Sequence, residues 1–244
     1  MRKIIPLNFD WFVAPYEETH LETIDTSIFE KVSIPHHGVE IPYNHFNEKD
    51  LQTVLSYIKD LFIEEEYEGK SVKLRFEGVA HEARVYINSE FVFEHRGGYT
   101  PFVVDISSVC EYGKHNQLMV IVDSKEDTSI PPFGGVVDYL GYCGIYREVS
   151  LIVTNKLFIK SVFVQTDGSS ELKVEVAVSQ GNGELELTIF QGKEKVVEVD
   201  SIKVIDSTTN IQAKIDKPIL WSLDAPVMYE AIIRFRANDK VIDE

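Results

Sequence analysis

The stretch 72–93, VKLRFEGVAHEARVYINSEFVF, decides the fold class. In 72–76 and again in 83–87, apolar residues alternate with charged or polar ones, the pattern of a β-strand with one buried face. Asn88-Ser89 separates the second run from Phe91-Val92-Phe93, and Asn tolerates the left-handed backbone that a hairpin turn needs. The stretch therefore predicts consecutive antiparallel strands, with a β-hairpin at Asn88.

The same period of two continues through the rest of the chain. Further strands are expected at 102–106, 117–122, 145–153, 157–165, 171–178, 184–190, 195–204, 210–215 and 228–236. Short strands with turn-forming residues between them about every eight to twelve positions are typical of antiparallel β-sandwiches. Because 244 residues is long for one sandwich, we predict two all-β domains, 1–153 and 154–244.

One segment fits two kinds of structure. Between Glu48 and Glu65, apolar residues recur at spacings of three and four, as on an amphipathic helix. The later part of this segment, 56–63, equally suits a strand. Periodicity alone does not separate the two.

The charge balance argues against two classes of partner. The sequence has 24 Lys and Arg against 40 Asp and Glu, a formal net charge of −16. Such a surface repels phosphate backbones and anionic lipid, so neither a nucleic-acid nor a membrane partner is expected. The start of the chain lacks an apolar run of secretory length, and Cys110 and Cys143 are too few for a disulfide framework. We therefore expect a soluble, cytoplasmic protein with reduced thiols.

No pattern indicates a metal or a cofactor. The pair His36-His37 lacks a third ligand at a convincing spacing. The acidic run Glu64-Glu65-Glu66 is expected to be a solvated face, because adjacent side chains point in different directions. We therefore predict no cofactor, no metal site and no catalytic residue in this chain.

Several motifs resemble those of one enzyme family. Residues 96–102, RGGYTPF, resemble the GGYTPF segment in the N-terminal sugar-binding domain of family 2 glycoside hydrolases, the β-galactosidase, β-glucuronidase and β-mannosidase group. The family's RFEGV and A-x-V-Y-x-N-G are similar to 75–79 and 83–89, although Ser89 replaces the glycine. GIxRxV resembles 144–149, and W-S-x-x-x-P-x-L-Y resembles 221–229. The order and spacing of these motifs extend the resemblance over essentially the whole chain.

The resemblance implies a particular pair of sandwiches. It predicts a jelly-roll, galactose-binding-like domain over 1–153 and an immunoglobulin-like β-sandwich over 154–244, the latter truncated before its last strand. It favours a strand at 56–63, and it makes Trp221 and Tyr229 aromatics of a sandwich core or a domain seam. In this family a barrel of alternating strands and helices holds the two catalytic glutamates. Because the sequence shows no such alternation, neither glutamate is expected here.

The same resemblance implies a function. The chain is expected to be the N-terminal, non-catalytic part of a retaining β-glycosidase, most similar to β-galactosidases, and inactive alone. Its partner is then a carbohydrate substrate bound through the missing catalytic domain, and the parent enzyme is expected to be a homo-oligomer. A β-glucuronidase and a free-standing carbohydrate-binding module stay open as alternatives. A structural or adhesive sandwich pair is less favoured, because it would require export.

One loop residue is implied as substrate-binding. Asp138 stands six residues before Gly144, where the family has an Asp that reaches into the active site and accepts hydrogen bonds from sugar hydroxyls. A carboxylate suits this role because it offers only acceptors and can take two hydroxyl donors. The alternative is a loop Asp that caps nearby backbone amides. Tyr139 and Tyr142 either line the sugar site or pack under the loop, and packing is favoured.

Overall fold

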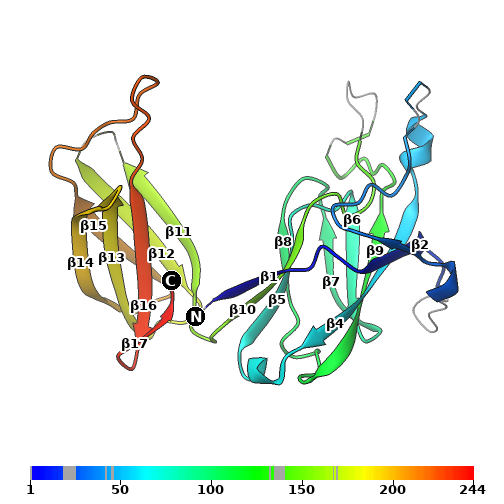
Figure 1. Ribbon diagram of the computed structural model, residues 1–244, viewed down its shortest axis with the longest axis horizontal. Coiled ribbons are helices and arrows are strands. Elements are labelled where there is room, and N and C mark those ends of the chain that lie inside the picture. The colour runs from blue at the N-terminus through cyan, green and yellow to red at the C-terminus, as the bar shows by residue number, and fades with distance from the viewer. Residues whose placement is uncertain are drawn as a thin grey trace. The chain divides into compact units, whose positions relative to one another are not determined.

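The chain folds as two β-rich units (Figure 1). The computed structural model describes residues 2–18, 26–41, 43–44, 47–131, 133–134, 141–166, 168 and 170–244. One unit spans Lys3–Val153, and the other comprises Thr154–Glu244 together with Arg2. The described residues form strands and short 3₁₀ helices, which confirms the predicted all-β class. None of the helices in this part of the chain is long and apolar enough to cross a membrane.

The N-terminal unit is a sandwich of two sheets. A six-stranded sheet, antiparallel throughout, has the order β3-β2-β4-β9-β6-β7, and a four-stranded sheet has the order β1-β10-β5-β8. The strands are β1 (Lys3–Pro6), β2 (Trp11–Pro15), β3 (Glu30–Val32), β4 (Val54–Ile63), β5 (Ser71–Phe76), β6 (Glu82–Ile87), β7 (Glu90–Arg96), β8 (Phe102–Asp105), β9 (Lys114–Asp123) and β10 (Val149–Thr154). Among the described residues, the 3₁₀ helices η2 (Thr26–Ile28), η3 (Glu48–Leu51) and η4 (Glu65–Tyr67) lie between these strands.

The ambiguous segment is mainly a strand. β4 pairs with β9 over its full length, from Val54 opposite Asp123 to Ile63 opposite Lys114, so the helical interpretation of this part is wrong. Tyr57 packs in the main core between the sheets, whereas Ile58 packs in a second cluster with Met119. Because β4 buries side chains on both faces, its apolar residues do not alternate cleanly. Helical structure in this segment is confined to η3, just before β4, and to Glu65, where η4 begins.

The predicted hairpin is present. β6 and β7 pair in antiparallel register around Asn88 and Ser89, whose φ angles are 51° and 68°. The Asn88 side chain accepts a hydrogen bond from the Gln117 amide at 2.8 Å and donates one to Asn116 at 2.9 Å. These bonds hold the left-handed turn, even though Ser89 stands where the family has glycine.

The C-terminal unit is a second sandwich. A three-stranded sheet, β11-β12-β15, faces a four-stranded sheet, β14-β13-β16-β17, across a core that includes Val174, Leu187 and Phe235. The strands are β11 (Ile159–Thr166), β12 (Glu171–Val178), β13 (Gly183–Gln191), β14 (Glu194–Val204), β15 (Thr208–Lys214), β16 (Glu230–Ala237) and β17 (Lys240–Asp243). The predicted class of two successive β-sandwiches is therefore confirmed.

Trp221 and Tyr229, at the two ends of the motif 221–229, have different environments. Tyr229 packs against the core of the C-terminal unit, and its hydroxyl accepts a hydrogen bond from the Ile219 amide at 2.9 Å. Trp221 is 57% exposed. Of the two predicted environments for Trp221, the sandwich core is therefore wrong, since this residue lies exposed on the connection between β15 and β16. A place in a domain seam stays a prediction.

Candidate functional site

The structure describes the residues before and after the candidate substrate loop. Asp138 and Tyr139 lie in 135–140, outside the described residues, so the structure does not place the side chain proposed to contact sugar. The chain is described up to Gly134 and again from Gly141. The site is therefore built from the contacts that fix these two ends.

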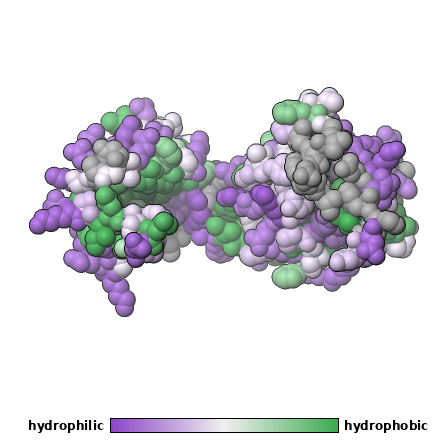
Figure 2. All heavy atoms as spheres, turned by 90° about the horizontal axis from the view of Figure 1, so that it is seen from above, coloured by the Kyte–Doolittle hydropathy of each residue, from purple (hydrophilic) through white to green (hydrophobic). Residues whose placement is uncertain are grey.

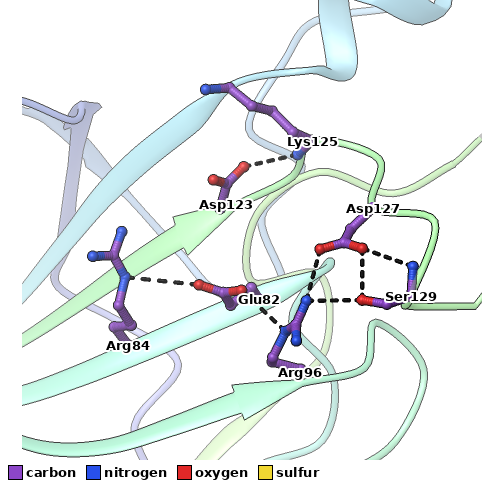
Figure 3. Close-up of polar contacts among 7 residues, drawn as sticks. All are labelled: Glu82, Arg84, Arg96, Asp123, Lys125, Asp127 and Ser129. Carbon is purple, nitrogen blue, oxygen red and sulfur yellow. Dashed lines mark hydrogen bonds and ion pairs between the residues drawn. The ribbon is translucent and has the colours of Figure 1, made fainter.

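An arginine holds the chain that enters the loop (Figure 3). Arg96, the last residue of β7, donates to the Asp127 carboxylate at 2.6 Å and to the Ser129 hydroxyl at 3.0 Å. Its guanidinium also lies 3.3 Å from the carboxylate of Glu82, its neighbour in the β6–β7 register. A planar guanidinium can serve several acceptors at once. Arg96 thus joins the edge of the six-stranded sheet to the segment that follows β9.

The entering segment is further fixed by its own turn. One carboxylate oxygen of Asp127 accepts from the amide and the hydroxyl of Ser129, at 2.7 and 2.6 Å. These bonds, with help from Arg96, hold the pKa of Asp127 below its usual value. The Ile130 amide donates to the Asp127 carbonyl and the Phe133 amide to the Ile130 carbonyl. Ile130 is buried, so the turn is also anchored by packing.

The residues in Figure 3 include both acidic and basic side chains, and their contacts with one another hold the backbone in place. Burial, followed by the charge of Glu94, raises the pKa of Glu82, and the cations Arg84 and Arg96 oppose this. Asp123 accepts from the backbone amide of Lys125 at 3.0 Å. Among the described residues, no group of three or more His, Cys, Asp or Glu could hold a metal ion. The carboxylates here bind arginine and backbone amides.

The chain after the loop is held at Gly144 by hydrogen bonds of its backbone amide and carbonyl. Its amide donates to the Ser124 hydroxyl at 3.3 Å, and its carbonyl accepts from the Ala80 amide at 3.1 Å. The Ser124 hydroxyl donates to the Ala80 carbonyl at 2.7 Å, which closes this small network. Gly144 has φ 90°, and a Cβ at this position would lie 2.2 Å from the Tyr57 hydroxyl oxygen. Only glycine fits the first position of the GIYREV motif.

His36 supports the same region. Its amide donates to the Ile145 carbonyl at 2.8 Å, and its Nδ1 lies 2.8 Å from the Tyr57 hydroxyl. Burial lowers the pKa of His36 and raises that of Tyr57, so both stay neutral near pH 7. The pair therefore supports the backbone at Gly144 and Ile145.

Stacked tyrosines connect the two strongest motifs. The hydroxyl of Tyr146, in GIYREV, donates to the carbonyl of Gly98, in RGGYTPF. Tyr142 stacks on Tyr146 with ring centroids 4.1 Å apart and planes at 7°, and Tyr99 meets Tyr142 edge-on at 6.4 Å. Gly98 is needed because a Cβ there would lie 2.8 Å from Nδ1 of His81. Tyr142 stacks on Tyr146 and keeps 43% of its surface exposed, so its predicted packing under the loop stays a prediction.

The sequence indicated the Asp138 loop but not the contacts of Arg96 that hold the chain before it. Arg96 belongs to the RGGYTPF motif, but its partner Asp127 lies 31 positions further along the chain. The only local signal was Asp127-Thr128-Ser129, a pattern in which an Asp side chain can bond the amide two residues on. That pattern indicates a turn and says nothing of the distant arginine.

Comparison with known proteins decides the family. Residues 13–155 match the model described as glycosyl hydrolases family 2, sugar binding domain, and residues 156–244 match the model described as glycosyl hydrolases family 2. The chain belongs to glycosyl hydrolase family 2. The resemblance inferred from the motifs is therefore confirmed, and the two matched models together cover nearly all of the sequence.

Individual family 2 relatives include two named activities. The chain is 39% identical to a β-galactosidase of Thermoanaerobacterium thermosulfurigenes, over 98% of this chain and 36% of that protein. It is 32% identical to a β-glucuronidase of Bacteroides fragilis, over 77% of this chain and 30% of that protein. The crystal structure of a Bacteroides uniformis β-glucuronidase superimposes with a TM-score of 0.84 at 24% identity, over 100% of this chain and 31% of that one, which shows a shared fold. This family 2 chain thus spans about a third of the length of such relatives.

Proposed function

We propose that this chain is the N-terminal, non-catalytic part of a retaining β-glycosidase that hydrolyses O-glycosyl bonds, and that the enzyme is a β-galactosidase. The observation that carries the proposal is that two family 2 models match residues 13–155 and 156–244, with 39% identity to a β-galactosidase over 98% of this chain. Before Asp138 in the chain, Arg96 binds Asp127 and Ser129, and after it Gly144 donates to the Ser124 hydroxyl. The 39% identity to a β-galactosidase favours that substrate class. Cys110 and Cys143 are buried free thiols, which supports a cytoplasmic enzyme.

In this proposal the chain supplies binding and the catalytic domain supplies the chemistry. A retaining glycosidase uses two carboxyl groups about 5 Å apart, one as acid/base and one as nucleophile. Asp138 is proposed to accept hydrogen bonds from hydroxyls of the sugar, which orients the ring for attack.

The proposal is tested by Asp138→Asn in a full-length enzyme that contains this chain. A hydrogen bond to a charged group contributes about 1.5–3 kcal/mol, so kcat/KM should fall roughly tenfold to a hundredfold. Asp216→Asn is the matched control, since Asp216 is exposed on the C-terminal unit. Its kinetics should equal those of the parent. Equal kinetics of the Asp138 variant would remove the proposed role.

A β-glucuronidase is the second candidate, favoured by the 32% identity to a named β-glucuronidase. The ratio of kcat/KM on a chromogenic galactoside to that on the matching glucuronide decides between the two. A free-standing carbohydrate-binding module is a third candidate, because the matched model is named for sugar binding. It predicts calorimetric binding of free galactose by residues 1–244 alone, whereas our proposal predicts binding too weak to detect.

A further inference from the structure

Phe133 has a backbone conformation that its residue type rarely adopts. Its φ is 66°, in the left-handed region. Among the described residues, the other non-glycine positions with a φ in this region are occupied by Asp, Asn, Ser and Lys. A left-handed backbone brings Cβ too close to the following carbonyl oxygen, which costs free energy in residues other than glycine. Within the described chain, Phe133 is thus the one bulky apolar residue that bears this cost.

The neighbouring contacts hold Phe133 in this conformation. Its amide donates to the Ile130 carbonyl at 2.7 Å, and the Ile130 amide donates in turn to the Asp127 carbonyl at 3.0 Å. The Ile130 side chain is buried. Gly134, which follows with a φ of 73°, lines a small hollow together with Ile130 and His81. The chain is therefore fixed on both sides of Phe133, and strained backbone persists only where the surrounding structure determines it.

Packing of the ring does not explain the conformation. Phe133 is 61% exposed, and among the described residues it belongs to no hydrophobic cluster. Exposure alone would mean little, because Figure 2 shows hydrophobic surface scattered among hydrophilic residues, and single exposed apolar side chains are common. Glycine, however, would form the same turn without the steric cost. Because strain at such positions is typical of ligand-binding segments, Phe133 is a candidate ligand contact.

Tyr142, the exposed aromatic residue after the loop, differs in this respect. It is 43% exposed, but its ring stacks on Tyr146 at a centroid distance of 4.1 Å and meets Tyr99 edge-on at 6.4 Å. These contacts account for its place in the fold. Phe133 has no such account, so the ligand contact is assigned to Phe133 and not to Tyr142.

We propose that Phe133 contacts the leaving group of the substrate and selects glycosides whose leaving group has a flat apolar face, either a second sugar ring or an aryl group. This inference rests on the proposed function. Asp138 follows five residues later, so its Cα lies within roughly 18 Å of that of Phe133. The sugar unit that is cleaved must lie against the two carboxyl groups of the catalytic domain, and the leaving group extends from it. An exposed aromatic ring before the loop suits the second part, because aromatic side chains stack on flat faces.

The kinetics of a full-length enzyme on three galactosides test the proposal. Phenyl β-galactoside has an aryl leaving group, lactose has a sugar ring, and methyl β-galactoside has no flat leaving group. Phe133→Ala should lower kcat/KM about two- to tenfold for at least one of the first two, the factor expected for the loss of one aromatic contact. The methyl substrate should be unaffected. A loss on phenyl β-galactoside alone assigns an aryl group, and a loss on lactose alone assigns a sugar ring.

Phe91→Ala is the matched control. Phe91 is 54% exposed and lies near the start of β7, whereas the contacts with the segment before the loop are made by Arg96 at the other end of this strand. Its replacement removes an exposed phenyl ring of the same unit without touching the loop. The kinetics on all three substrates should therefore equal those of the parent.

Phe133→Gly separates a ligand contact from a structural role. Both Phe133→Gly and Phe133→Ala remove the ring, but only glycine also relieves the left-handed backbone, because alanine keeps Cβ. The two variants should show the same kinetic loss. Only Phe133→Gly should raise the Tm of the N-terminal unit, by about 2–4 °C. Trp11 is buried in this unit, so its fluorescence in this chain with Trp221→Phe reports the transition.

Three outcomes would overturn the proposal. Equal losses of Phe133→Ala on all three substrates would show that Phe133 does not act on the leaving group, and no loss on any of them would show that it contacts no substrate. A lower Tm of Phe133→Gly than of the parent would show that the ring stabilises the fold. Asp138→Asn, measured alongside, should lower kcat/KM for all three substrates. If it lowers none, the proposed function fails, whatever the result for Phe133.

Discussion

The two sandwiches differ in how completely they cover their cores. In the N-terminal unit the inner residues of β5, Val72, Leu74 and Phe76, are fully buried between two broad sheets. In the C-terminal unit the corresponding inner residues of β11, Val162 and Val164, are nearly half exposed. The unit that frames the candidate loop therefore closes its core with its own strands. The other unit leaves the inner side of β11 partly exposed, so its stability is expected to depend more on single anchoring contacts.

The largest loss of stability is expected when a methyl group is added at Gly144 in the N-terminal unit. Gly144→Ala places a methyl group 2.2 Å from the Tyr57 hydroxyl oxygen, at φ 90°. Overpacking and the left-handed backbone should together destabilise the N-terminal unit by about 2–4 kcal/mol. Trp11 is buried in this unit and Trp221 belongs to the other. Urea unfolding followed by fluorescence in a Trp221→Phe background therefore reports the N-terminal unit alone.

The control for this prediction is a glycine with room around it. Gly69 also has a left-handed φ, 78°, but no atom lies within 4 Å of the position that a Cβ would occupy there. Gly69→Ala should cost only the backbone term, about 1 kcal/mol. Equal losses at the two glycines would mean that the contact with Tyr57 does not matter.

A smaller loss of stability is expected when the Arg2 side chain, which binds Asp243 in the C-terminal unit, is removed. Arg2 donates to the fully buried Asp243 at 2.8 Å and also to the Ile159 carbonyl. Arg2→Ala leaves the Asp243 carboxylate buried with fewer partners, which should destabilise the C-terminal unit by about 1–3 kcal/mol. Fluorescence of Trp221 in a Trp11→Phe background measures this.

Lys3→Ala is the neighbouring control. Lys3 pairs with Glu66 on the surface of the N-terminal unit, and exposed pairs contribute little. The Trp221 transition should be unchanged in this variant. A transition as low as that of Arg2→Ala would show that any loss of positive charge near the start of the chain weakens the C-terminal unit, and that the buried contact is not special.

The smallest effect is a difference in response to acid. All seven histidines precede position 116, and burial lowers the pKa of His36 and His81 below 6.5. Between those lowered pKa values and 6.5, the unfolded chain binds more protons than the folded one, so stability falls as pH falls. The N-terminal unit should therefore lose stability from pH 7 to 5.5 relative to the C-terminal unit, as measured by the two urea midpoints. Parallel changes in both units would contradict this.

The elements with a clean pattern were predictable from sequence. The alternation in 83–87 and the Asn88 turn gave the β6–β7 hairpin correctly. β4 was ambiguous because both of its faces are buried, and β2, at Trp11–Pro15, was missed because its five residues are bounded by no strong signal. The substrate-binding role of the Asp138 loop was predicted only from the family resemblance. The contact between Arg96 and Asp127 could not be predicted, since only the fold brings these two residues together. Local patterns report pairing and turns, whereas a site assembled from distant segments needs the tertiary structure.

The central claim is that Asp138 of this chain binds a sugar hydroxyl in an active centre completed by another domain. A double-mutant cycle in a full-length enzyme tests it most directly, by combining Asp138→Asn with substrates that lack one hydroxyl each. For at least one deoxy substrate the variant and the parent should have nearly the same kcat/KM, because the contact is already lost. Fully additive losses for every deoxy substrate would show that Asp138 does not bind a sugar hydroxyl.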